Sequence, residues 1–134
     1  MPDWVLALQK PWWYPGDAVW GSVNQIWVPV YILFSLLYLV VFYRVIKGDW
    51  PWITAVPFIV NILTTFLFVV IAVQFKDLLP VAIDIFAMFG AMVWGLVLVW
   101  RRSRRLAALG LPYAIWLTVF MVMYAELLRL NVFA

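Results

Sequence analysis

Residue types that could take part in a reaction are scarce in this chain. The sequence contains no histidine and no cysteine, which excludes imidazole general bases, thiolate nucleophiles and disulfide bonds. It also lacks a glycine-rich phosphate loop, a serine placed beside a base, and two carboxylates within one apolar stretch. Those patterns indicate phosphate binding, acyl transfer, and a proton relay or metal site. The sequence therefore predicts a protein that is not an enzyme and holds no metal.

A few polar residues nevertheless interrupt long apolar stretches. The amide of Asn61 carries donors and acceptors that a single helix cannot satisfy, so Asn61 should face other helices. A hydrogen bond between helices and an amide that orients a ligand are both open interpretations. The helix dipole explains Asp84 near the start of a helix. A local salt bridge explains Glu126 and Arg129, which stand three residues apart.

The most unusual stretch is KPWWYP at residues 10–15, where Trp12, Trp13 and Tyr14 lie between two prolines. Tryptophan and tyrosine concentrate at membrane interfaces, so the stretch could be a simple anchor. Flanking prolines also make a stiff, shaped segment, and flat rings stack on flat, conjugated ligands. An aromatic lid over a binding site is therefore the second interpretation of residues 1–18.

The elements that hold these residues must cross a membrane. Of the 134 residues, 69% are hydrophobic and 11% are charged, and the mean hydropathy is +1.06. A span needs about 20 mostly apolar residues, and the segment before Trp12 is too short for one. The sequence predicts an all-α integral membrane protein with one domain over residues 1–134. Its four transmembrane helices are expected at about residues 19–45, 52–75, 79–100 and 106–130.

Lysine and arginine are distributed unequally between the connections. Six lie in the connections after the first and third expected helices, and three lie on the opposite side. Basic residues accumulate in cytoplasmic loops, so we expect both termini to lie outside the cytoplasm. The expected membrane is a bacterial or archaeal inner membrane. The run RRSRR could also touch anionic lipid or nucleic acid. The membrane topology explains this run more simply, and no nucleic-acid partner is expected.

Both ends of the chain resemble the TspO/translocator family of tryptophan-rich sensory proteins. The stretch WVLALQKPWWYPG resembles the family's first loop, in which a tryptophan precedes L-x-K-P-x-W-x-P-P, and Trp27 and Tyr31 repeat its W-x-x-x-Y pattern. The stretch LPYAIWLTVFMVMYAELLRLN resembles the last family helix, with P-Y-x-x-W and a closing Arg-Leu-Asn. Asn61 falls where the family has asparagine in Q-x-x-x-N-x-x-W-[ST].

The resemblance implies a fold, a ligand and a site. Family members have five helices, and this chain resembles that bundle without its first helix. The family binds porphyrins, haem-pathway intermediates and cholesterol-like molecules under its first loop, usually as a homodimer. The resemblance therefore implies a membrane sensory protein that binds a porphyrin or related tetrapyrrole. The residues it places around the ligand are Trp12, Trp13, Trp27, Tyr31, Asn61, Trp94, Trp116, Phe120 and Tyr124.

Departures from the family pattern favour an alternative. Pro57 and Thr64 replace the family glutamine and tryptophan, while Phe120 and Tyr124 replace a pocket alanine and asparagine. The last two side chains would fill space that holds ligand in relatives. The chain could instead be a small accessory or structural subunit of a larger, pigment-containing membrane complex.

The missing first helix suggests where a partner would bind. A second copy or another membrane subunit is expected to pack on helices 19–45 and 106–130, with lipid covering the rest. The expected groove is lined by Leu33, Leu37 and Val41 at helical spacing.

Overall fold

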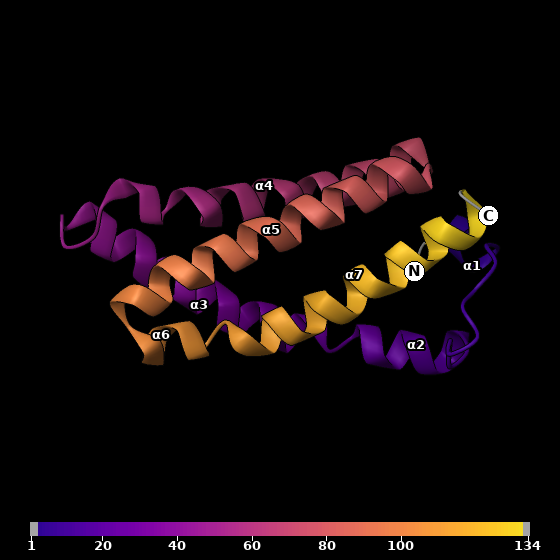
Figure 1. Ribbon diagram of the computed structural model, residues 1–134, viewed down its shortest axis with the longest axis horizontal. Coiled ribbons are helices and arrows are strands. Elements are labelled where there is room, and N and C mark those ends of the chain that lie inside the picture. Colours follow the sequence, from indigo (N-terminus) through magenta and orange to yellow (C-terminus); the bar gives the residue numbers. More distant parts are fainter. Residues whose placement is uncertain (1–2, 133–134) are drawn as a thin grey trace.

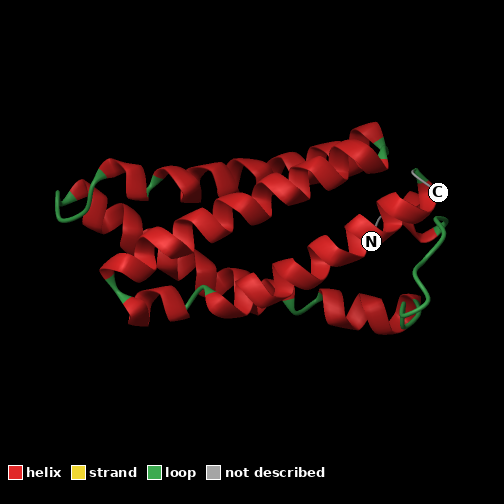
Figure 2. Ribbon diagram, viewed as in Figure 1, coloured by secondary structure: helices red, strands yellow, loops and turns green. Residues whose placement is uncertain are grey.

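The computed structural model describes residues 3–132, and this part of the chain consists of helices and short connections without a β-strand (Figure 2). Within the described residues, four helical stretches are long and apolar enough to cross a membrane: Asp17–Ile46, Trp52–Phe75, Leu78–Arg102 and Leu111–Asn131. The all-α membrane fold class is therefore confirmed.

Within these stretches the helices have the following bounds. The N-terminal half contains α1 (Asp3–Leu6), α2 (Asp17–Asn24), α3 (Trp27–Ile46), the 3₁₀ turn η1 (Trp52–Thr54) and α4 (Val56–Val70). The C-terminal half contains the π-helical turn η2 (Ile71–Phe75), α5 (Leu78–Arg102), α6 (Arg104–Ala108) and α7 (Leu111–Asn131).

The first expected helix, residues 19–45, is divided into α2 and α3. Pro29 lacks the N–H that would donate to the carbonyl of Gln25, and a proline ring clashes with the carbonyl four residues earlier. The helix accordingly breaks at Gln25 and Ile26. Figure 1 shows the consequence: α2 lies below the C-terminal half of α7, while α3 continues behind α5 and α6.

The last expected helix, residues 106–130, is divided as well. Ser103 is extended (φ −155°, ψ 110°), which ends α5, and its side chain accepts a hydrogen bond from the backbone N–H of Leu106. Ser103 therefore caps the short helix α6. Pro112 lies in the first turn of α7, where its missing N–H costs no hydrogen bond.

The N-terminal segment closes one end of the bundle. The Trp4 indole donates to the backbone carbonyl of Ala72 over 2.8 Å, in the turn that ends the second span. The Asn131 side chain accepts a hydrogen bond from the backbone N–H of Gln9 over 2.8 Å. It also donates one to the backbone carbonyl of Gln9 over 2.9 Å. The bonds of Asn131 join α7 to the N-terminal segment, and Figure 1 shows α1 beside the end of α7.

Helix α5 lies between its neighbours and packs against both α4 and α7, and α3 packs against α7. An aromatic cluster holds α3 in place: the Phe34 ring lies 4.4 Å from the Tyr113 ring of α7, in a stacked arrangement, and 5.6 Å from the Phe58 ring of α4. Phe34, Phe58 and Tyr113 are all buried, so they form the centre of the core.

The prediction that Leu37 and Val41 line an open groove is wrong, because both side chains are fully buried within this chain. The reason is that this face of α3 turns toward α7: a Cβ atom added at Gly110 would lie 3.2 Å from the Leu37 Cδ2. The exposed row of α3 is instead formed by Ile32, Leu36, Leu39 and Tyr43. Lipid covers such a row at no hydrophobic cost.

Polar groups on α3 and α7 are satisfied locally. The Ser35 hydroxyl donates to the Tyr31 carbonyl over 2.8 Å. The Arg129 guanidinium donates to the Glu126 carboxylate over 2.7 Å. Each group has its hydrogen-bond partner on its own helix, so none of them points to a second chain.

Candidate functional site

A cavity of about 180 Å³ lies where the start of α3 meets α4, α5 and α7. Its wall is mostly aromatic, and its residues come from five helices, so the cavity exists only in the assembled bundle. The residues that line it are Asn24, Trp27, Tyr31, Thr65, Phe68, Val69, Met88, Tyr113, Trp116 and Phe120.

Two pairs of rings at helical spacing form part of the wall. Trp27 and Tyr31 are one turn apart on α3, with ring centroids 5.9 Å apart in an edge-on arrangement. Trp116 and Phe120 are one turn apart on α7 and stack at 4.8 Å. Residues at i and i+4 lie on the same helix face, which is why each pair presents its rings together.

One part of the wall is polar. The side chain of Thr65 lies beside the hydroxyls of both Tyr31 and Tyr113. The Thr65 hydroxyl itself donates to the Asn61 carbonyl over 2.7 Å. A ligand with one hydrogen-bonding group could therefore orient that group toward the tyrosine hydroxyls.

Asn61 supports this polar wall from behind and does not line the cavity. Its amide nitrogen donates to the Met88 carbonyl over 3.2 Å and to the Tyr113 hydroxyl over 3.4 Å, and the residue is fully buried. The amide thus links α4 to α5 and α7. Its Oδ1 atom has no hydrogen-bond partner among the described residues.

Phe120 and Tyr124 occupy different layers. Phe120 lines the cavity, whereas Tyr124 lies behind it, 1% exposed, with its ring 4.8 Å from that of Phe120. The Phe68 ring of α4 contacts both, at 5.6 and 6.3 Å. The two substituted family positions therefore form one packed cluster that reduces the cavity on its α7 side.

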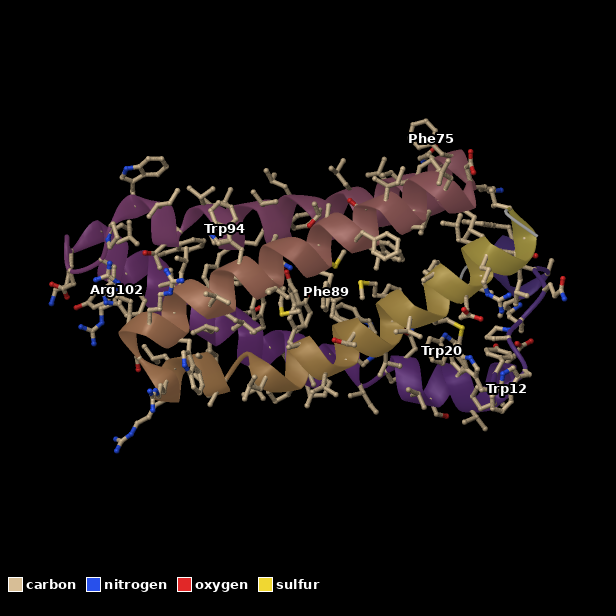
Figure 3. All side chains as sticks on the ribbon, viewed as in Figure 1. Trp12, Trp20, Phe75, Phe89, Trp94 and Arg102 are labelled. Atoms are coloured by element: carbon tan, nitrogen blue, oxygen red, sulfur yellow. The ribbon has the colours of Figure 1, made fainter. Side chains whose placement is uncertain are left out.

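Three of the expected site residues lie away from the cavity. Trp94 is 41% exposed and lies on α5 about 120° around the helix from Met88. Trp12 is 93% exposed, and Trp13 packs partly against the core. Figure 3 shows Trp94 near α4 and α5 and Trp12 near the end of the molecule that holds α1.

Residues 3–18, the described part of the N-terminal segment, contribute no side chain to the cavity wall. Trp13 and Tyr14 pack against the core near the N-terminal end of the chain. The Tyr14 hydroxyl donates a hydrogen bond to the Asp17 carboxylate. Burial, and then this hydrogen bond, raises the pKa of Tyr14 to about 12. In this structure KPWWYP therefore packs at the N-terminal end of the bundle and does not cover the aromatic cavity.

Several lining residues were not predicted from the sequence. Phe68 and Met88 lie in apolar stretches without any distinguishing pattern. Tyr113 did carry a signal, because it is a polar group in an apolar helix. Thr65 can satisfy its hydroxyl within its own helix, which is why the sequence alone does not mark it.

The chemistry available in the cavity is stacking and hydrogen bonding. Within residues 3–132 no group of three or more carboxylate side chains comes together that could hold a metal ion. The polar groups at the wall are hydroxyls, indole N–H groups and one amide, and none of them carries a charge.

Comparison with known proteins identifies the family. No curated protein and no solved structure matches the chain significantly. A model of the TspO/MBR family matches residues 1–130, nearly the whole chain, in agreement with the motifs of the aromatic loop and the last helix. With its four apolar helices and its aromatic cavity, the chain is an integral membrane protein that belongs to the TspO/MBR family.

Proposed function

We propose that this protein binds a small, flat aromatic molecule in the cavity between α3 and α7 and acts by binding, without catalysis. The observation that carries the proposal is the wall itself, in which two aromatic pairs lie next to two tyrosine hydroxyls. Such a wall binds a conjugated ring by stacking and burial, with the hydroxyls fixing its orientation.

The volume of the cavity limits the size of the ligand that it can hold. Sites for drug-sized ligands measure about 300–1,000 Å³, and an apolar cavity of about 150 Å³ holds one benzene ring. The cavity here measures about 180 Å³, which suits a molecule of one or two rings. The porphyrin implied by the family resemblance requires Phe120 to be displaced or removed first.

The matched pair Trp27 and Trp94 tests this proposal, because both are 41% exposed and only Trp27 lines the cavity. The probe is 2-naphthol, which has two fused rings and one hydroxyl, titrated against the protein in lipid nanodiscs by its fluorescence. Loss of one stacking ring is worth about 1–3 kcal/mol, so Trp27→Ala should weaken binding about tenfold. Trp94→Ala should leave binding unchanged.

Empty nanodiscs provide the control for partitioning of the probe into lipid. If both variants and the parent bind 2-naphthol equally, or no more than empty nanodiscs do, then the cavity is not a binding site for aromatic molecules.

We also propose that both termini face away from the cytoplasm in a bacterial or archaeal inner membrane. Support comes from the charge distribution, because the connections at 47–51 and 103–110 lie at one end of the bundle with most basic residues (Figure 1). The chain has no native cysteine, so Ala18→Cys and Ala108→Cys each introduce a single thiol at an exposed position.

An impermeant thiol reagent added to intact cells should label Ala18→Cys and should label Ala108→Cys only after the cells are opened. Labelling of both variants from the same side would contradict the four-span topology. The reverse pattern would retain the topology and overturn its orientation.

A further inference from the structure

A second hollow, of about 370 Å³, lies on the outer face of α5 and α7 and is separate from the aromatic cavity. On α5 it extends from Phe89 to Arg101, and on α7 it includes Ala114 and Thr118. At a rise of about 1.5 Å per residue this length is about 18 Å, close to the thickness of one leaflet of a hydrocarbon core of about 30 Å.

Most of the groove is apolar. The Thr118 hydroxyl donates to the Ala114 carbonyl over 2.7 Å, so its hydrogen bond is made within α7. Val93 and Val97 are 41% and 44% exposed and form part of the wall. A surface of this kind, open to the membrane along a helix, matches an acyl chain.

The groove ends among basic side chains. Arg101 lines the groove and also a smaller hollow of about 220 Å³ that includes Arg102 and Thr54. Figure 3 places Phe89 near the middle of the molecule and Arg102 at the end that holds α6, so the groove passes from membrane depth to the basic end.

The positive charge at this end is not neutralised within the described residues. The ion pairs found in residues 3–132 are Arg44 with Asp49 and Arg129 with Glu126, and the four arginines at 101, 102, 104 and 105 form none. Trp100, which lies under the Arg104 guanidinium at 5.5 Å, belongs to the groove wall. A tryptophan at this position is typical of the headgroup level.

We propose that this groove binds an anionic phospholipid, with one acyl chain along α5 and α7 and the phosphate beside Arg101. Two independent features favour this occupant: an apolar channel one leaflet long, and a cluster of arginines without carboxylate partners where that channel ends. A free phosphate would use only the second feature, and a zwitterionic lipid would use mainly the first. The proposal does not depend on ligand binding in the aromatic cavity.

Three exposed positions allow a matched test by native mass spectrometry of the protein released from detergent. The probes are phosphatidylglycerol, phosphatidylcholine of the same acyl composition, and glycerol 3-phosphate. A basic residue near an anionic headgroup contributes about fivefold in affinity, so Arg101→Gln should lower phosphatidylglycerol retention about fivefold. Arg105→Gln removes the same charge from the same cluster. Because Arg105 lines neither hollow, this substitution should have little effect on retention.

Val97→Trp should also lower phosphatidylglycerol retention, because the larger side chain fills the apolar channel and leaves every arginine in place. Equal losses for Arg101→Gln and Arg105→Gln would show diffuse attraction to positive charge and overturn the site. Equal retention of both lipids by the parent, or binding of glycerol 3-phosphate as tight as the lipid, would overturn it as well. Unchanged melting temperatures show that the variants remain folded.

Discussion

The double variant Phe120→Ala, Tyr124→Asn is expected to bind protoporphyrin at least tenfold more tightly than the parent protein. Phe120 lines the cavity and Tyr124 lies directly behind it, so the smaller side chains join their space to the existing 180 Å³. Burying about 60 Å² more of the ligand surface is worth about 1.5 kcal/mol, which corresponds to about tenfold in affinity. Quenching of the porphyrin fluorescence in nanodiscs measures the change.

The gain in porphyrin affinity should come with a loss of stability. Replacing a buried phenylalanine with alanine costs about 3–5 kcal/mol, so the double variant should also unfold at lower temperature. Tyr124→Phe is the control, because it keeps the ring that packs against Phe120 and Phe68 and should change neither property much. Porphyrin affinity equal to or lower than that of the parent would show that these side chains do not limit the site.

Asn61→Asp is expected to destabilise the protein about as much as the loss of a buried aromatic ring at the cavity wall. Asn61 is fully buried, and its Nδ2 supplies the hydrogen bonds to the Met88 carbonyl and the Tyr113 hydroxyl. A carboxylate at this position loses both N–H donors and places an unpaired charge in the membrane interior. Such a charge costs about 3–5 kcal/mol. Thermal unfolding in detergent micelles, followed by circular dichroism, measures the loss.

The apolar substitution Asn61→Leu separates the effect of charge from the loss of hydrogen bonds. It removes the same two bonds without adding a charge, and the net cost of a typical hydrogen bond is only about 0.5–1.5 kcal/mol. We therefore expect Asn61→Leu to melt well above Asn61→Asp. Equal melting of the two variants would mean that water or lipid headgroups reach position 61 and that the site is not dry.

The family resemblance placed two pairs of residues around a ligand, and all four line the cavity wall. Trp27 with Tyr31, and Trp116 with Phe120, stand four residues apart, and helical geometry places such pairs on one face whatever the rest of the fold does. The expected helix at residues 19–45 did not include the break between α2 and α3, although a local rule explains it, because Pro29 cannot supply the hydrogen bond to Gln25. Both features depend on only one turn of chain.

The sequence by itself determined that this is a helical membrane protein, because lipid offers no hydrogen bonds and long apolar segments must satisfy their backbone as helices. Only the tertiary structure decided which face of each helix is inside. Leu37 points into the core and Trp94 toward the outside, although both lie in uniformly apolar helices. In a soluble protein, polar residues mark the outer face. Lipid is as apolar as the protein core, so a membrane helix carries no such mark, and packing alone brought Phe68 and Met88 to the cavity.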